Sequence, residues 1–270
     1  QTCALPIFPG LIEDLQKKGL AYESDGALVV DIAQEGDAKE YPPCIVRKSD
    51  GAALYATSDL ATIIEREQDF HPDRYIYVVD KRQELHFIQV FRVAKKAGIV
   101  KEDTPMIFLG FGTMNGKDGG PFKTREGGVM RLEHLIKNID EKVYEKIQEK
   151  QKVPADEMTR TAEIVGLAAL KYADLSNQAT KDYIFDVDRF ISFEGNTGPH
   201  IQYMIVRIKS ILEKYKELRG ADAKVVPIRP AESETEKALQ MALCRFGEVT
   251  ESAFYETAPH KLCQYMAAVA

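Results

Sequence analysis

A glycine-rich segment with basic side chains follows a short apolar run near the middle of the chain. Residues 110–128 contain seven glycines, together with Lys117, Lys123 and Arg125. Glycine lets backbone N–H groups approach an anion, and the cations neutralise phosphate charge. The segment is not a P-loop, because Phe122 stands where that motif places glycine before its Lys-Thr pair. It is typical either of a phosphate-binding loop or of an exposed hairpin whose cations only improve solubility.

A second candidate lies at residues 54–61, Leu-Tyr-Ala-Thr-Ser-Asp-Leu-Ala, where an extended run leads into a helix. Tyr55 and Asp59 are one helical turn apart and share a face. A carboxylate is the natural partner of a guanidinium, whose planar fork donates two parallel hydrogen bonds. The alternative is an ordinary helix start, where the helix dipole favours an acid. Gln83, just past a strand that ends at Asp80, is either another ligand contact or a polar residue at a helix N-terminus.

Several other kinds of chemistry are disfavoured by composition and spacing. The five histidines are scattered without HxxxH or HExxH spacing, so we predict surface or capping roles for them and no metal site. The four cysteines form no CxxC pair and predict no disulfide framework, which favours a reducing cytoplasm. No apolar run approaches the roughly 20 residues that cross a bilayer. The formal net charge of −6 permits only a local basic groove for nucleic acid.

The elements that must position these residues change character along the chain. Between residues 28 and 112, short β-rich runs alternate with amphipathic stretches, which predicts a doubly wound α/β sheet that binds ligands at the carboxyl ends of its strands. The expected strands are 28–32, 44–47, 74–80 and 105–109, and the expected helices are 57–67, capped by Thr57 or Ser58, and one that ends at Gly98.

From about residue 131 the β signal disappears and the pattern predicts helices. The clearest has apolar residues at three-and-four spacing from Ile201 to Leu218 and ends at Gly220. A loop at 221–232 precedes two more helices, one with Leu239, Leu243, Phe246 and Val249, and one opened by Pro259. The helix from Ile201 to Leu218 carries a net positive stripe, which is either a nucleic-acid contact or a solvated face. Its cations are Arg207, Lys209, Lys214, Lys216 and Arg219.

Four segments together resemble the arginyl-tRNA synthetase family, in that order and spacing. They are Tyr-Ala-Thr-Ser-Asp-Leu-Ala at 55–61, Tyr-Val-Val-Asp-Lys-Arg-Gln-Glu-Leu-His at 77–86, the glycine-rich 111–128, and Phe-Glu-Gly-Asn-Thr-Gly-Pro-His-Ile-Gln-Tyr at 193–203. The resemblance runs from about residue 11 to the end. It implies the second half of a Rossmann-type class I synthetase catalytic domain followed by an all-α, DALR-type anticodon-binding bundle. The implied domains are 1–150 (partial catalytic), 151–195 (helical junction) and 196–270 (truncated anticodon-binding).

The resemblance also implies an activity and a set of roles. The activity is ATP-dependent activation of L-arginine to arginyl-adenylate and transfer to tRNA(Arg) in the cytoplasm, with Mg²⁺ accompanying ATP and no dedicated metal site. By this resemblance, arginine is bound by Tyr55, Asp59 and Gln83, and ATP is bound by Phe111, Gly112, Met114, Lys123 and Arg125. The implied catalytic residues are Lys123, Thr124 and Arg125, and the implied tRNA contacts are Arg207, Lys209, Lys214 and Lys216.

The sequence departs from the family pattern at several points. Residues 122–125 occupy the KMSKS position without that signature, and His200 replaces a usual Tyr. No HIGH-type motif is present and residues 1–9 match nothing, so we expect an excerpt that is inactive by itself. The remaining alternative is a noncatalytic tRNA-binding paralogue of the same fold. A dehydrogenase or generic ATPase is disfavoured, because GxGxxG and a P-loop are both absent.

Overall fold

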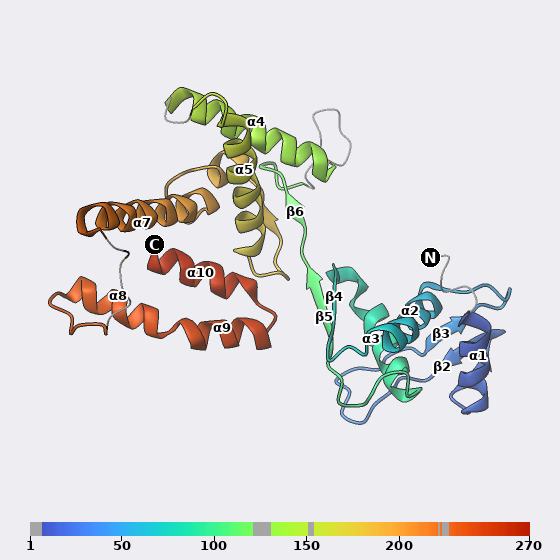
Figure 1. The fold of residues 1–270 in the computed structure, drawn as a ribbon. Coiled ribbons are helices and arrows are strands. Elements are labelled where there is room, and N and C mark those ends of the chain that lie inside the picture. Colours follow the sequence, from blue (N-terminus) through green and yellow to red (C-terminus); the bar gives the residue numbers. More distant parts are fainter. Residues whose placement is uncertain (1–6, 121–130, 151–153, 221, 223–226) are drawn as a thin grey trace. The chain divides into compact units, whose positions relative to one another are not determined.

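The computed structural model describes residues 7–120, 131–150, 154–220, 222 and 227–270. The chain forms two compact units, an N-terminal unit of residues 1–111 and a C-terminal unit of residues 112–270 (Figure 1). Each unit is described by itself. No helix among the described residues combines the length and the apolar character needed to cross a membrane.

The N-terminal unit begins with a helix and a small antiparallel sheet. The strands β1 and β2 form a hairpin around the Asp25-Gly26 turn, and β3 pairs with β2 on its other side. Asp-Gly is a typical two-residue hairpin turn, because both positions tolerate positive φ. The bounds are α1 Ile7–Lys17, β1 Ala21–Ser24, β2 Ala27–Val30 and β3 Cys44–Arg47.

A parallel β–α–β element follows in the same unit. Strands β4 and β5 pair in parallel over six positions, from Tyr75 opposite Met106 to Asp80 opposite Phe111. The crossover between them contains a short 3-10 turn and α3, as a parallel connection requires. The bounds are α2 Tyr55–Asp69, β4 Tyr75–Asp80, η1 Lys81–Gln83, α3 Glu84–Lys96 and β5 Met106–Phe111.

One hydrophobic core joins these elements. Helices α2 and α3 pack with the inward-facing residues of β4 and β5, and the core includes Leu60, Ile63, Tyr75, Phe87 and Val90. The other face of β4 is exposed, with Ile76 at 45% and Val78 at 60%.

The register of α3 is fixed by polar contacts as well as by burial. Its Arg92 donates two hydrogen bonds to the carboxylate of Asp37, at 2.6 and 2.7 Å, and one to the carbonyl of Ile32.

The C-terminal unit is mainly helical. Helices α4 and α5 pack along each other around Leu135, Ile139, Val143, Ala162 and Ala169. A two-residue parallel ladder joins β6 to β7 beside them. The bounds are β6 Met114–Asn115, α4 Leu132–Lys150, α5 Met158–Leu175, β7 Tyr183–Ile184, α6 Val187–Phe190, α7 Gly198–Arg219, α8 Glu234–Cys244, α9 Phe246–Tyr255 and α10 Pro259–Val269.

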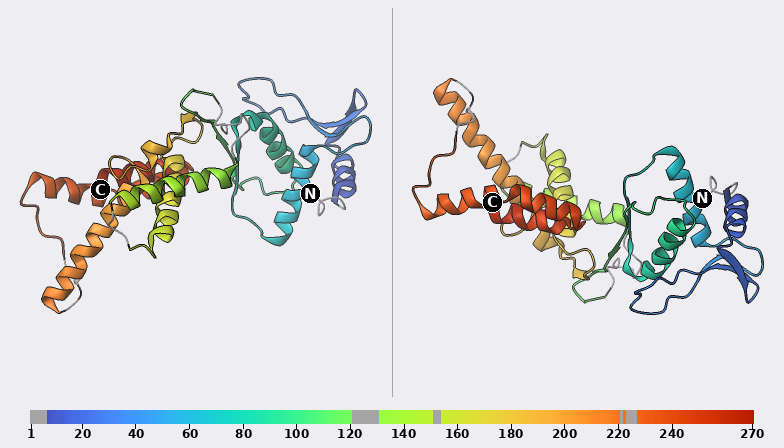
Figure 2. Two further views of the ribbon diagram at one scale, coloured as in Figure 1. Left: turned by 90° about the horizontal axis from the view of Figure 1, so that it is seen from above. Right: turned by 90° about the horizontal axis from the view of Figure 1, so that it is seen from below.

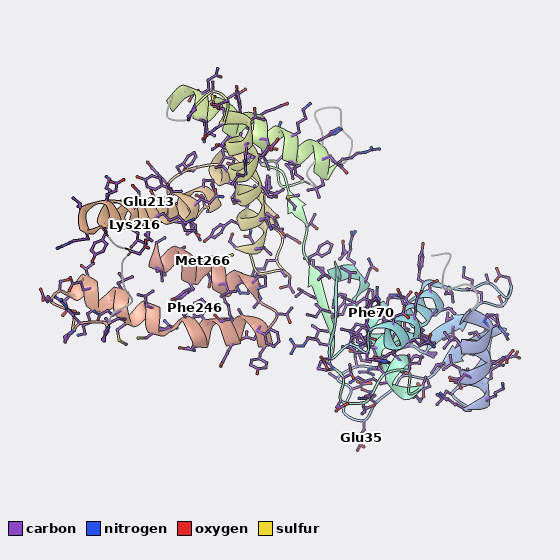
Figure 3. All side chains as sticks on the ribbon, viewed as in Figure 1. Glu35, Phe70, Glu213, Lys216, Phe246 and Met266 are labelled. Atoms are coloured by element: carbon purple, nitrogen blue, oxygen red, sulfur yellow. The ribbon has the colours of Figure 1, made fainter. Side chains whose placement is uncertain are left out.

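Helix α7 packs on α5 only near its beginning. Gly198 and Pro199 are buried, but the apolar side chains from Ile205 to Leu218 are between 44% and 84% exposed. Both views in Figure 2 show the end of α7 extending beyond α4, α5 and α10, and Figure 3 shows Glu213 and Lys216 on this part. Within the described residues, the apolar side of α7 is therefore largely uncovered.

Several predicted elements are confirmed and others are corrected. The glycines at 98 and 220 terminate α3 and α7 with positive φ, and Pro259 opens α10. The strands expected at 28–32 and 44–47 belong to the antiparallel sheet and not to the parallel one. The expected absence of strands after residue 131 was wrong at β7, which pairs with β6.

Two helix boundaries also differ from the expectation. Helix α2 starts at Tyr55 and not at Thr57 as expected. Thr57 lies inside the first turn, where its hydroxyl accepts a hydrogen bond from the N–H of Leu54 and donates one to the carbonyl of Val46. The single helix that was predicted to contain both Leu239 and Val249 is two helices, α8 and α9. The break is at Arg245, whose N–H bonds to Ala242, three residues back.

Candidate functional site

Asp59 lies in the second turn of α2 and pairs with a histidine from another helix. Its Oδ2 is 2.6 Å from Nε2 of His86, in the first turn of α3, and the side chains are 32% and 26% exposed. Helix α2 has no acidic residue in its first turn, so a helix-start function does not explain Asp59. The prediction of a surface or capping role for His86 was wrong. Sequence reasoning missed this partner, although it lies in the segment 77–86.

An aromatic cluster supports this pair. The ring of His86 meets Phe87 edge-on with a centroid separation of 4.9 Å, and Phe87 is 4% exposed. Phe87 also contacts Tyr77, Phe91 and Phe108. Burial raises the pKa of the Tyr77 hydroxyl, and the negative charge of Asp59 raises it further while Arg66 opposes both effects. Asp59 therefore lies near the Tyr77 hydroxyl, next to a cluster of aromatic rings.

Tyr55 and Gln83 are more exposed than Asp59. Tyr55 is the first residue of α2 and is 77% exposed, and Gln83 is an exposed residue directly before α3 without a side-chain capping bond. Both side chains are therefore open to solvent. Tyr55 lies one helical turn before Asp59, and Gln83 lies three residues before His86. Their contacts with arginine stay a prediction.

The carboxyl ends of β4 and β5 lie side by side, since Asp80 is paired with Phe111. Asp80 accepts from the Nε and a terminal N–H of Arg82, at 2.9 and 2.6 Å, and from its backbone N–H. These bonds lower the pKa of Asp80 to about 2 and make it an ionised partner of Arg82. Phe111, one of the residues predicted to bind ATP, is 44% exposed at this edge.

In the C-terminal unit, residues 112–115 are held against residues 179–185. The N–H of Gly112 bonds to the carbonyl of Ala179, and the N–H of Thr113 bonds to the carboxylate of Asp182. A Cβ on Gly112 would lie 2.4 Å from the carbonyl oxygen of Lys181, so close packing alone requires glycine there. Met114 is half-buried and packs against the core of α4 and α5. Both residues predicted to bind ATP in this segment therefore have structural functions as well.

Lys117 is not a free phosphate ligand. Its Nζ lies 3.0 Å from Asp186 and 3.8 Å from Asp188, and Lys142 lies 2.7 Å from the same carboxylate of Asp188. These carboxylates raise the pKa of Lys117. The interpretation of Lys117 as a phosphate cation is replaced by one in which it ties the glycine-rich segment to α6. Lys123, Thr124 and Arg125 lie outside the described residues.

The segment 193–200 forms the junction from which α7 begins. The Thr197 hydroxyl caps α7 by accepting from the N–H of His200 and donates to the carbonyl of Ser192. Asn196 is 2.5 Å from the hydroxyl of Tyr172, which also lies 2.8 Å from the carbonyl of Cys263 on α10. The resemblance marked this segment without giving it a function, and the structure assigns it the joining of α5, α7 and α10.

The cations of α7 do not form one stripe. At 3.6 residues per turn, Arg207 and Lys214 share one edge of the helix, and Lys209 and Lys216 share the edge nearly opposite. The uncovered apolar side lies between these two edges. Lys216 pairs with Asp222 at 2.9 Å, and both side chains are more than half exposed.

Within the described part of the chain, no group of three or more His, Cys, Asp or Glu side chains is arranged to hold a metal ion. Asp186 and Asp188, at the start of α6, are paired with Lys117 and Lys142. The donor set described here does not form a cage for Mg²⁺.

Comparison with known proteins places this geometry in a family. Residues 3–187 match the family of tRNA synthetases class I (R), catalytic domain, and residues 201–270 match the DALR anticodon binding domain. The arginine–tRNA ligase of Agathobacter rectalis is 55% identical over 274 residues, which cover 98% of this chain and 46% of that protein. The arginine–tRNA ligase of Alkaliphilus oremlandii is also 55% identical, over 95% of this chain and 43% of its own length. The chain thus spans slightly less than half the length of these curated relatives.

Solved structures share the fold at low sequence identity. The arginyl-tRNA synthetase of Plasmodium falciparum superposes with a TM-score of 0.79 at 23% identity, covering 98% of this chain and 44% of that one. The Thermus thermophilus arginyl-tRNA synthetase gives 0.77 at 21% identity, covering 98% and 48%. The chain therefore belongs to the arginine-type class I tRNA synthetases, joining residues of their catalytic domain to a DALR anticodon binding domain.

Proposed function

We propose that the protein carrying this chain is an arginine–tRNA ligase that acts in the cytoplasm on L-arginine, ATP and tRNA(Arg). The observation that carries the proposal is a shielded carboxylate, Asp59, held by His86 in a chain 55% identical to arginine–tRNA ligases. In the proposed site, Asp59 binds the guanidinium, and Tyr55 and Gln83 complete the arginine contacts. The noncatalytic paralogue is not favoured, because these relatives are named as ligases.

The reaction needs no covalent bond to the protein. The arginine carboxylate attacks the α-phosphorus of ATP and pyrophosphate leaves; a terminal ribose hydroxyl of tRNA then attacks the carbonyl carbon of the adenylate and AMP leaves. The protein therefore contributes positioning and electrostatic stabilisation. Phe111, Gly112 and Met114 are proposed to hold the adenine. Lys123 and Arg125 neutralise the developing phosphate charge, with Thr124 as a hydroxyl support.

Mg²⁺ enters this proposal with ATP. In this proposal the ion is held by phosphate oxygens and water, and not by a dedicated set of carboxylates. When bound, the ion supplies positive charge over the phosphates in addition to that of Lys123 and Arg125.

The proposal is tested in a full-length enzyme, made by putting this chain in place of the matching segment of the Agathobacter rectalis ligase. We call it the reconstituted enzyme. We expect arginine-dependent ATP–pyrophosphate exchange in the presence of tRNA(Arg), and none with lysine. A folded reconstituted enzyme that lacks exchange with arginine would contradict the proposal.

The tRNA contacts are tested by charge reversal on α7. Because the cations lie on two edges, the pairs Arg207/Lys214 and Lys209/Lys216 are reversed separately. Each phosphate contact that is lost should lower the slope of log affinity against log salt by about 0.7–0.9. We expect the slope to fall for the edge that faces the RNA. If neither pair changes the slope, the α7 cations belong to a solvated face and do not contact tRNA.

A further inference from the structure

The contact between Asp59 and His86 is a tertiary one. The two residues are 27 positions apart, on the facing helices α2 and α3. An ionised carboxylate carries no proton, so the hydrogen of this bond is on Nε2 of the imidazole, which donates to Oδ2. The separation of 2.6 Å shows a close contact between the imidazole and the carboxylate.

This bond engages one oxygen of the carboxylate. Among the described residues, no hydrogen bond reaches Oδ1 of Asp59, and the side chain is 32% exposed. A carboxylate with one oxygen held cannot rotate freely about its terminal torsion, which is otherwise broad. His86 thus determines which oxygen Asp59 presents.

His86 is itself on a rigid support. Phe87 and Val90 of the same helix are 4% and 0% exposed in the core. Gln89 donates to the carbonyls of Pro42 and Pro43, and Arg92 binds Asp37. Helix α3 is therefore anchored on its apolar and polar sides, as is needed for a residue that fixes the geometry of another.

We propose that His86 is a positioning residue for arginine recognition: it donates its Nε2–H to Oδ2 of Asp59 and holds the carboxylate with Oδ1 directed to the guanidinium. This inference rests on the proposed function, since it assumes that Asp59 binds arginine. His86 touches neither arginine nor ATP and acts only through Asp59. Its loss should therefore change the affinity for arginine and leave ATP binding intact.

The test compares two replacements in the reconstituted enzyme. His86→Phe keeps a ring but removes the donor, and His86→Gln keeps an N–H donor at the Nε2 position. A hydrogen bond to a charged group has a strength that corresponds to roughly tenfold or more in binding. We expect His86→Phe to raise KM for arginine about tenfold with KM for ATP nearly unchanged. His86→Gln should stay within about threefold of the parent enzyme.

A matched control separates positioning from general loosening of α2. The hydroxyl of Tyr75 donates to Glu67 at the far end of the same helix, at 2.8 Å. Tyr75→Phe removes this bond and should leave KM for arginine unchanged. If His86→Phe folds poorly, His86→Asn replaces it, because its shorter amide does not reach Oδ2 and the same rise in KM is expected.

A double-mutant cycle with Asp59→Asn completes the test. In the Asp59→Asn background, His86→Phe should change KM for arginine less than twofold, because the charge that His86 orients toward the guanidinium is gone. An equal effect in both backgrounds, or no effect of His86→Phe in the parent, overturns the positioning function while Asp59→Asn still impairs arginine use. If Asp59→Asn itself leaves KM for arginine unchanged, the proposed arginine site fails and the inference fails with it.

Discussion

Gly198→Ala should strongly destabilise the C-terminal unit, because α5 and α7 touch at this glycine. A Cβ there would lie 2.3 Å from the carbonyl oxygen of Ala168 and 3.0 Å from Cβ of Tyr172, whereas ordinary contact begins at 3.4 Å. The helices would have to separate by about 1 Å, and neither obstacle is the mobile end of a side chain. Overpacking of this kind costs about 1–3 kcal/mol, and a backbone obstacle indicates the upper end.

The size of the effect can be measured on the 270-residue chain. For a unit of about 150 residues, about 3 kcal/mol corresponds to a fall of roughly 6–12 °C in the unfolding midpoint. The assay is thermal unfolding followed by far-ultraviolet circular dichroism. Two other glycines of the same unit provide controls. Gly166 lies inside α5, where alanine is intrinsically favoured by about 1 kcal/mol, and Gly247 lies in the first turn of α9.

The controls differ in what the new methyl group meets. At Gly166 the nearest atom is Oδ1 of Asp140, at 2.1 Å, but this carboxylate can rotate away; the oxygen is buried without a hydrogen-bond partner among the described residues. Gly166→Ala should therefore change stability by less than about 1 kcal/mol. At Gly247 nothing lies within 4 Å, and alanine should stabilise the unit slightly. A midpoint for Gly198→Ala within 2 °C of the parent, or equal losses at Gly198 and Gly166, would refute the close-contact argument.

Three further predictions concern charge and reactivity. Asp59→Asn in the reconstituted enzyme should lower kcat/KM for arginine by about ten- to hundredfold, since a charge-assisted hydrogen bond contributes roughly 1.5–3 kcal/mol; neutral citrulline should lose less, and equal losses would remove Asp59 from the site. Under native conditions iodoacetamide should modify exposed Cys244 and spare Cys44, whose thiol pKa burial raises to about 12; mass spectrometry that finds Cys44 labelled first would contradict the fold. Hydrogen bonds from Arg92 lower the pKa of Asp37 from 3.8 to about 2, so this pair stabilises the fold above pH 4 and its contribution is lost between pH 4 and 2. In urea unfolding, the free energy of unfolding of Arg92→Gln should therefore fall less than that of the parent between pH 4 and 2. Parallel curves of this free energy against pH would exclude the linkage.

The sequence determined much of the local structure of this protein. The β-branched run at 75–80 forms a strand, and Gly98 and Gly220 end their helices, because these preferences act within a few residues. The same is true of the candidate residues: Tyr55 and Asp59 share one helix because their spacing matches its period. The four ordered segments also identified the family, because residue types at fixed spacing can be read without knowing how the chain packs.

Tertiary structure decided which of these residues have partners. Sequence spacing does not reveal that α3 brings His86 to Asp59, because the contact joins positions 27 residues apart. It also does not reveal that Lys117 is bound by Asp186, or that Gly198 faces the backbone of α5. Such contacts depend on how whole elements bury their apolar faces. That burial places α3 beside α2 and α7 across α5, and the polar partners follow from it.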